Sequence, residues 1–280
     1  DQRTLGTIGG GNHFAELQQV ESIIDEEACA KMGIKEDHMY LLIHSGSRAL
    51  GYSVFEQHVE KATKETNGLK EGTELFRDYM TKHDHCCDWA KANRELIAKR
   101  FLDCLGANLY EESNQVLNIW HNAVVKRSFL QEHNGNNEDE RRTDTTKDYY
   151  LHRKGAAPAD VGYCVIPGSR GDFSYIVNPT PSRIQQQRSG YSLPHGAGRK
   201  LRRDQARNRA KGVIDPSRLA TTSLGSCVVC EDSNLLYEEA PQAYKEIEGI
   251  IQDLTDTGTA SVVAIMRPVL TYKMRSTVYR

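Results

Sequence analysis

Residues 189–199 read Ser-Gly-Tyr-Ser-Leu-Pro-His-Gly-Ala-Gly-Arg and place one imidazole, that of His195, between small residues. Glycine near a reactive group lets a phosphate approach the main chain and permits bends that a Cβ would forbid. The segment from Arg199 to Lys211 then holds seven Lys or Arg residues and one acid. Such a run is either a solvated helix face or a binding site for phosphates. Because it follows the histidine loop directly, we expect the second, with His195 acting on a phosphorus atom.

The 280-residue chain has the composition of a globular protein, with 38% hydrophobic residues, 26% charged residues and a net charge of −2. It contains no run of about 18 apolar residues and no signal peptide, so we expect a cytoplasmic protein with no membrane partner. The seven cysteines form no small-scaffold disulfide framework, which favours reduced thiols. No repeat or shift in composition divides the chain, so we predict a single domain over residues 1–280.

Apolar periodicity predicts helices at 50–66, at 73–106 and near 241–254, and buried strands at 39–43 and 261–273. Pro268 argues for a sheet edge or a break in the last strand. The polar, charge-mixed segment 131–148 is typical of a surface loop. Because strands and helices do not alternate regularly, we predict an α+β fold with mixed or antiparallel sheets.

Three further histidines lie in Gly-, Ser- or Asn-rich motifs at the ends of apolar runs. They are His13 after Gly9-Gly10-Gly11-Asn12, His44 before Ser45-Gly46-Ser47-Arg48, and His121 before Asn122. Imidazole suits divalent ions such as manganese and zinc, and a two-ion site stabilises both oxygens in phosphoryl transfer. We therefore expect a metal site, beside which a fourth histidine, neutral on one nitrogen, could serve as nucleophile. Serine and glycine amides together with Arg48 would form a phosphate cradle.

Two other groups of potential metal ligands are interpreted as ordinary structure. His83-Asp84-His85-Cys86-Cys87 lies in the predicted helix 73–106, where consecutive side chains point in different directions. Cys227 and Cys230 form a lone C-x-x-C without the second pair of a zinc site.

Taken together, these motifs resemble those of the RtcB family of RNA-splicing ligases and run in the family's order along essentially the whole chain. The segments that carry the resemblance are Gly9-Gly10-Gly11-Asn12-His13-Phe14, His44-Ser45-Gly46-Ser47-Arg48, His121-Asn122, Arg153-Lys154-Gly155-Ala156, Pro167-Gly168-Ser169, Ser174-Tyr175, His195-Gly196-Ala197-Gly198-Arg199, Ala243-Tyr244-Lys245 and Lys273. The resemblance implies a sheet-rich core that encloses a central cleft, with helices outside.

The activity that the resemblance implies is a GTP- and manganese-dependent RNA ligase. It joins RNA ending in a 2′,3′-cyclic phosphate or 3′-phosphate to RNA with a 5′-hydroxyl, in splicing or repair. His195 matches the residue that attacks the α-phosphorus of GTP to give a guanylated histidine. The guanylate then passes to the RNA 3′-phosphate, and the 5′-hydroxyl displaces GMP.

Further residues match the family's positions by their motifs. The matches to metal ligands are His13, His44 and His121; the matches to nucleotide-binding positions are Asn12, Glu16, Ser169, Ser174, Gly196, Ala197, Gly198, Tyr244 and Lys273; and Arg48 and Arg199 are candidate phosphate or RNA binders. Fragments of tRNA or ribosomal RNA are the implied partners. An accessory activating protein and the oligomeric state are left open.

The chain also departs from the family's pattern. The family carries an Asp and a metal-bridging Cys in an Asp-x-Gly-Cys-Gly segment upstream of the glycine motif. We expect this sequence to lack that leading segment. Without the bridging Cys, the second of the family's two metal ions is expected to be held weakly. Arg202 stands where the family usually has Ser, and 131–148 is longer than the family's connection. These departures favour a divergent paralogue devoted to RNA repair.

Two functions of other classes remain as alternatives. One is a non-catalytic RNA-binding relative, and the other is a metal-dependent RNA-end phosphodiesterase or phosphatase. The intact His195 loop and nucleotide-binding positions disfavour both alternatives, whereas the missing Asp and Cys favour them.

Overall fold

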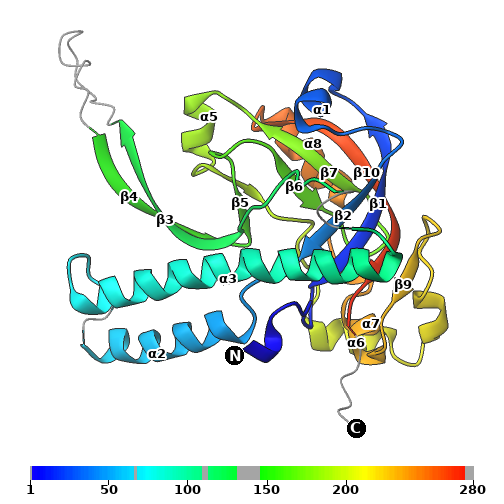
Figure 1. The fold of residues 1–280 in the computed structure, drawn as a ribbon, viewed down its shortest axis with the longest axis horizontal. Helices are drawn as coiled ribbons and strands as arrows, with labels where there is room; N and C mark the ends of the chain where they lie inside the picture. The colour runs from blue at the N-terminus through cyan, green and yellow to red at the C-terminus, as the bar shows by residue number, and fades with distance from the viewer. Residues whose placement is uncertain (1, 66–67, 109–112, 131–145, 275–280) are drawn as a thin grey trace.

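The last strand of the chain lies inside the main sheet rather than at its edge. The computed structural model describes residues 2–65, 68–108, 113–130 and 146–274 (Figure 1). The sheet has six strands, which are β1 (Phe14–Ile23), β2 (Met39–His44), β6 (Cys164–Pro167), β7 (Ser174–Pro179), β9 (Cys227–Val229) and β10 (Ala260–Tyr272). Five of them run in the order β2-β1-β10-β7-β6 with antiparallel neighbours, and β9 pairs parallel to the end of β10. The predicted α+β fold with mixed and antiparallel pairing is confirmed.

Pro268 sits in the middle of β10, so the expectation of an edge strand is wrong. On one side Pro268 pairs with Gln18 of β1, next to an irregularity in register. On the other side the β7 pairing ends at Met266 and the β9 pairing begins at Leu270. Proline has no N–H to donate to a neighbouring strand. Pro268 therefore lies between the part of β10 that pairs with β7 and the part that pairs with β9.

Two amphipathic helices cover the two faces of the sheet. Helix α8 (Ile247–Asp256) buries Ile247, Ile251 and Leu254, spaced four and three residues apart, in a cluster with β6 and β7. Helix α1 (Glu26–Met32) packs Cys29 into a second cluster with β7 and β10. The sheet between them is therefore held rigidly on both faces.

The long helix α3 (Glu74–Leu105) runs along the lower side of the molecule, with α2 (Ala49–Glu65) beside it (Figure 1). The Oγ1 of Thr73 accepts a bond from Phe76 N at its start, and Gly106 adopts a φ of 77° at its end. Both features satisfy backbone polar groups that would lack partners at the helix ends. The helices predicted at 50–66 and 73–106 are confirmed, with ends that differ by one residue. Among the described residues no helix is both long and apolar enough to cross a membrane.

A two-stranded hairpin projects from the body on one side (Figure 1). It consists of β3 (Asn122–Leu130) and β4 (Thr146–Lys154), which pair antiparallel over nine positions. A short pair, β5 (Ala156–Pro158) with β8 (Ser192–Pro194), joins it to the core. The predicted loop 131–148 falls outside the described residues except for its last three, which belong to β4.

The remaining elements are short. They are η1 (Gln2–Thr4), α5 (Arg183–Arg188), α6 (Arg203–Ala210), η2 (Pro216–Leu219), α7 (Ser233–Glu238) and η3 (Pro241–Ala243). The helix predicted near 241–254 begins only at Ile247. Tyr244, after η3, instead forms an extended bridge with Arg199.

Candidate functional site

All four histidines singled out in the sequence lie at strand ends. His13 precedes β1, His44 ends β2, His121 precedes β3 and His195 follows β8. Two pairings bring these ends together. Phe14 pairs with His44 between β1 and β2, whereas Ala156 of β5 pairs with Pro194 and donates its N–H to the His121 carbonyl at 3.1 Å.

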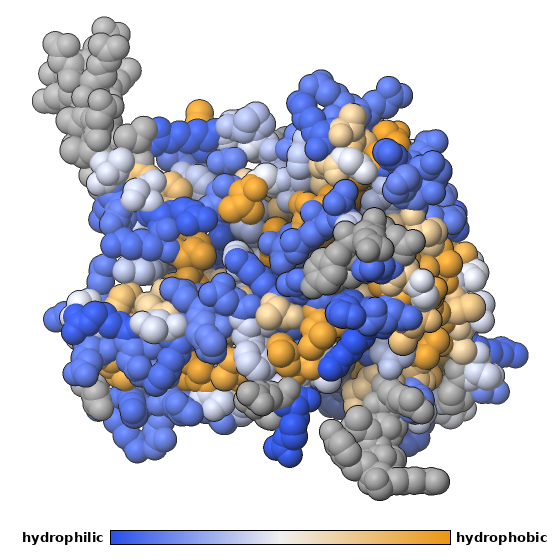
Figure 2. Space-filling view, viewed as in Figure 1, coloured by the Kyte–Doolittle hydropathy of each residue, from blue (hydrophilic) through white to orange (hydrophobic). Residues whose placement is uncertain are grey.

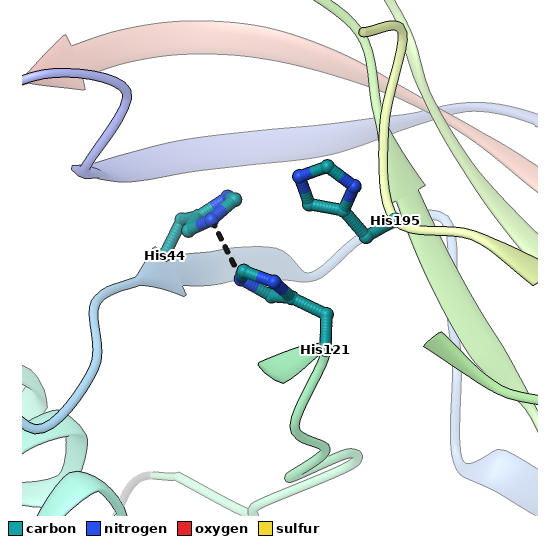
Figure 3. Close-up of side chains that lie close together, drawn as sticks. All are labelled: His44, His121 and His195. Atoms are coloured by element: carbon teal, nitrogen blue, oxygen red, sulfur yellow. Dashed lines mark hydrogen bonds between the residues drawn. The ribbon is translucent and has the colours of Figure 1, made fainter. Parts of the chain in front are cut away.

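His44, His121 and His195 form a compact group with ring nitrogens that all lie within 4.8 Å of one another (Figure 3). The Nε2 atoms of His44 and His121 are 3.0 Å apart, and the His121 and His195 ring centroids are 4.5 Å apart. The His13 ring centroid lies 6.1 Å from that of His44. The geometry therefore adds His195 to the predicted ligand set and leaves His13 at its margin.

The environment holds these imidazoles neutral. Burial lowers the pKa of His13 and of His121 to about 4, assisted by Arg48 for His13 and by His195 for His121. Burial and then the neighbouring His121 lower the pKa of His44, and burial lowers that of His195. The neutral ring is the form that ligates metals and acts as a nucleophile.

The residues present fit a divalent metal ion. Among the described residues, the Nδ1 atoms of His13 and His121 are buried without a hydrogen-bond partner, and a buried polar atom in this state is costly. A cation would satisfy Nδ1 of His13, whereas His121 turns its Nε2 toward Nε2 of His44 and would bind through that atom. Nitrogen ligands suit manganese and zinc. His44, His121 and His195, with His13 beside them, could hold it.

A buried asparagine on α3 ties two of the histidine-bearing segments together. Asn93 has no exposed surface. Its Oδ1 accepts from Gly6 N at 2.7 Å, and its Nδ2 donates to Ser45 Oγ at 3.0 Å and to Gly46 O at 3.1 Å. Asn93 thereby joins the loop before His13 to the loop after His44.

The next residue on α3 connects the third segment. The guanidinium of Arg94 donates to the carbonyl of Ser45 at 3.0 Å and to Oδ1 of Asn118 at 3.0 Å. Asn118 lies three residues before His121. Through two adjacent side chains, α3 sets the spacing between the His44 and His121 segments.

Gly9 leaves space for the side chain of Arg48, a predicted phosphate binder. Its φ is +102°, and a Cβ built there would lie 2.0 Å from the guanidinium of Arg48 and 2.7 Å from His13 Nδ1. Arg48 itself has a φ of 58° and donates to Thr7 Oγ1 at 3.2 Å. Arg48 therefore sits beside His13.

A cavity of about 240 Å³ opens beside the histidines, with His44 and His195 in its wall. Most of the predicted nucleotide-binding positions line it, namely Asn12, Glu16, Ser169, Gly196, Ala197, Gly198, Tyr244 and Lys273, as does Arg199. Ser174 lies behind the wall, where its Oγ accepts from Gln18 Nε2 at 2.9 Å. The same Gln18 amide donates to Glu16 at 2.7 Å, so Ser174 supports Glu16 indirectly.

Two ionisable groups in the cavity are almost fully buried. Glu16 is 4% exposed, and burial raises its pKa to about 7, against bonds from Thr271 and Gln18 that favour the charged form. Lys273 is 3% exposed, and burial lowers its pKa to about 8. Both groups therefore titrate near neutrality.

The sequence did not single out Glu239, which neutralises several cations. This carboxylate is 1% exposed and accepts from Arg199 at 3.0 Å and Arg203 at 3.3 Å. It also accepts from the Tyr244 hydroxyl, and burial, followed by Glu239, raises the pKa of that hydroxyl. Arg199, predicted to bind phosphate, thus faces the cavity while bonded to protein groups.

Arg170 was also missed, and it points to an anionic ligand. It lines the cavity and is buried, and its Nη2 donates to Leu236 O at 3.2 Å. In the described part of the chain its Nη1 has no hydrogen-bond partner. Arg170 follows the predicted Pro167-Gly168-Ser169 motif directly, which is the one signal that could have found it. Glu239 and Asn93 carried no local signal.

The two groups interpreted as ordinary structure do not form a multi-ligand metal cluster among the described residues. On α3, His83 Nε2 accepts from Val124 N at 3.0 Å and lies 3.8 Å from Cys87 Sγ. Cys227 and Cys230 are free thiols, as are the other five cysteines.

Comparison with known proteins gives consistent matches over the whole chain. The family described as tRNA-splicing ligase RtcB matches residues 1–274. RNA-splicing ligase RtcB2 of Escherichia coli is 41% identical over 97% of this chain and 65% of the relative. The tRNA-splicing ligase RtcB of Methanococcus maripaludis is 29% identical over 94% of this chain and 58% of the relative. The tRNA-splicing ligase RtcB of Methanocaldococcus jannaschii is 32% identical over 94% of this chain and 29% of the relative. The chain spans less than two thirds of the length of these relatives.

Proposed function

The chain belongs to the RtcB family, and from this membership we propose that it forms the catalytic part of a GTP- and manganese-dependent RNA ligase. The substrates are RNA with a 2′,3′-cyclic phosphate or 3′-phosphate end and RNA with a 5′-hydroxyl end. Fragments of tRNA or ribosomal RNA undergoing splicing or repair are the substrate class.

One observation carries this proposal. The cavity with the buried, partly unpaired Arg170 and the buried Lys273 shares His44 and His195 with the histidine group. A phosphate-bearing nucleotide in the cavity would therefore place a phosphorus atom next to His195. The Nη1 of Arg170, which has no hydrogen-bond partner among the described residues, and the buried ammonium of Lys273 favour such a ligand.

His195 is the proposed nucleophile. A hydrogen bond with the Gly155 backbone raises its pKa, while burial lowers it. That bond would keep one ring nitrogen as N–H, so the other nitrogen carries the lone pair that attacks. A P–N bond forms to the α-phosphorus of GTP, and pyrophosphate leaves.

The second half of the reaction uses the same centre. A cyclic phosphate is first opened by water to a 3′-phosphate. An oxygen of this 3′-phosphate attacks the guanylate on His195, which releases the imidazole and leaves the RNA end activated. The 5′-hydroxyl of the second RNA then attacks the 3′-phosphorus, and GMP leaves.

When bound by His44 and His121, which leaves the lone pair of His195 free to attack, manganese would supply charge neutralisation at phosphorus. Arg48 beside His13 and Arg170 in the cavity wall add positive charge. The Gly196–Gly198 backbone lets the phosphate approach closely, and Gly196 already lies tight against Pro167 O, where a Cβ would be 3.0 Å away. In-line positioning by these groups lowers the barrier.

Incubating the full-length protein with GTP labelled at the α-phosphate and manganese tests the proposal. We expect an acid-labile label on the protein that is lost in His195→Ala and kept in His38→Ala, a change of an exposed histidine. Joining of a cyclic-phosphate RNA to a 5′-hydroxyl RNA should follow the same pattern.

Each other outcome identifies an alternative. RNA binding without any label would indicate a non-catalytic RNA-binding relative. Opening or removal of the terminal phosphate without a label would indicate a phosphodiesterase or phosphatase. A label without joining would overturn the RNA ends assigned here but not the chemistry at His195.

A further inference from the structure

The β3–β4 hairpin has two faces with different surroundings. Side chains alternate across a β-ribbon, and the pairing places Phe129 opposite Lys147 and Arg127 opposite Tyr149 on one face, here called the inner face. The other, outer face carries Lys126 and Tyr150. Each face therefore has its own chemistry.

The outer face contacts α3 and the turn before it. Tyr150 contacts Phe76 with ring centroids 5.3 Å apart and donates its hydroxyl to Glu71 at 2.9 Å. Lys126 pairs with Glu71 at 3.4 Å and with Asp148 at 2.9 Å. The outer face thus fixes the hairpin to the body.

Aromatic rings form a continuous row along the inner face. Phe129 stacks on Tyr191 of the body with centroids 4.0 Å apart and planes 13° apart. Its other neighbour, Tyr149, lies 6.0 Å away, is 43% exposed and has the ammonium of Lys147 5.5 Å from its ring centroid. The row ends in an open ring with a cation beside it.

A cavity of about 390 Å³ lies between this row and the body. Its volume falls in the range of small-molecule pockets, roughly 300–1,000 Å³. Phe129 and Tyr191 supply apolar walls, while Arg127, Asp160 and Gln186 supply polar groups. Figure 2 shows apolar side chains in the region between the hairpin and the body, bordered by hydrophilic residues.

The charge of this region is net positive. Arg127 and Arg153 share the carboxylate of Asp160, at 2.8 Å and 2.7 Å, so two guanidinium groups face one acid, and Lys147 adds a further cation. Aromatic rings combined with cations are typical of surfaces that bind single-stranded nucleic acid by stacking on bases.

The inner face is continuous with the candidate active site. Strand β3 starts directly after His121, and β4 ends one residue before Gly155, whose added Cβ would lie 3.1 Å from His195 Cε1. Phe129 lies seven residues along β3 from Asn122, which corresponds to about 24 Å of extended strand. A short stretch of single-stranded RNA reaches that far.

We propose that the inner face of the hairpin, with the cavity beside Phe129, binds unstacked nucleobases of single-stranded RNA close to the end that reacts at His195. The inference rests on the proposed ligase function. Tyr149 stacks on a base, Lys147 contacts a phosphate, and the cavity lined by Phe129, Asp160 and Gln186 takes the neighbouring base. A duplex end, whose bases stay stacked, does not use this surface.

The binding test compares ring-deleting with ring-retaining variants of the full-length protein. The probes are fluorescent RNAs of about 12 nucleotides, within single-strand site sizes, ending either in a cyclic phosphate or in a 5′-hydroxyl. We expect Tyr149→Leu to weaken binding of one of them by about 5- to 100-fold and Tyr149→Phe to bind as the wild type does. The affected probe identifies which RNA strand lies on the hairpin.

A matched pair of lysines separates the two faces. Lys147→Gln should weaken binding and reduce the salt dependence by about one phosphate contact. Lys126→Gln, on the outer face, should leave both unchanged. 2-Aminopurine placed several nucleotides from the reacting end should be quenched on binding, and Tyr149→Leu should remove that quenching.

Labelling of His195 by GTP requires no RNA and is measured in parallel. Unchanged labelling in all variants shows an intact active site, and absence of labelling in the wild type defeats the ligase proposal without bearing on RNA binding. Equal affinity of Tyr149→Leu and wild type for both single-stranded probes overturns this inference, as does an equal loss with a blunt RNA duplex.

Discussion

The Nε2 atoms of His44 and His121 face each other at 3.0 Å. Two imidazole nitrogens at this distance either share one proton or turn both lone pairs toward a cation. The second arrangement makes each ring a metal ligand. In the proposed metal site, His44 and His121 therefore depend on each other.

We predict that Mn²⁺ raises the thermal unfolding temperature of the protein and that His121→Ala abolishes the rise. At a free Mn²⁺ concentration about 100 times the dissociation constant, the stabilisation is about 2.7 kcal/mol. Scanning calorimetry with a Mn²⁺ titration measures it. His38→Ala is the control, and an equal rise in His121→Ala would contradict the assignment.

Asn93→Ala should loosen the same site from a distance. Its loss leaves Gly6 N and Gly46 O without their buried partner, so we expect a cost of about 3 kcal/mol in the free energy of unfolding. Because one of the links between the His13 and His44 loops is then lost, Mn²⁺ affinity falls as well. Urea unfolding and Mn²⁺ titration measure the two effects. Lys99→Ala, an exposed change on the same helix, should alter neither.

Gly155 and Gly190 offer a matched pair of substitutions. Their φ angles are +65° and +59°, so alanine costs about 1–2 kcal/mol of backbone strain at each. Only at Gly155 would the new Cβ meet His195, 3.1 Å from Cε1, whereas Gly190 has nothing within 4 Å. We expect Gly155→Ala to slow labelling by GTP by about 10- to 100-fold and Gly190→Ala to leave it unchanged. Equal rates in both would exclude the contact as the cause.

Glu16 should make stability depend on pH. The folded protein keeps the Glu16 proton up to about pH 7, whereas the unfolded chain loses it near pH 4.5. Between these values the folded state binds more protons, so the free energy of unfolding falls as pH rises. Glu16→Gln should remove this decline, which amounts to roughly 3 kcal/mol, and Glu36→Gln at the surface should not. Urea unfolding from pH 4 to pH 8 measures the slopes, and parallel slopes for wild type and Glu16→Gln would refute the shift.

Local signals in the sequence were enough to predict much of the framework. Thr73 and Gly106 are a strong start and stop for α3, and the apolar run before His44 predicted β2. The helix predicted near 241–254 begins later, at Ile247. The reason is that Tyr244 is extended and pairs with Arg199. That contact joins residues far apart in the sequence, so the local hydrophobic periodicity does not reveal it.

The sequence singled out the four histidines but did not show how they group in space. His195 joins His44 and His121 through the β5–β8 pairing, which links positions 38 residues apart. Asn93 binds partners 47, 48 and 87 positions away. Nothing near Asn93 in the sequence distinguishes it from any other polar residue on an amphipathic helix.

The pairing of β1 with β10 also bears on how the protein is made. The cavity beside the histidines takes Glu16 from the first strand and Thr271 and Lys273 from the last strand and the residue after it. During translation, β1 therefore cannot pair with β10 until nearly all of this sequence has been synthesised. Until then its edge is exposed to aggregation or to chaperones. A nascent chain that stops before Ala260 holds every histidine of the site and yet lacks Thr271 and Lys273 from the wall of the cavity beside them.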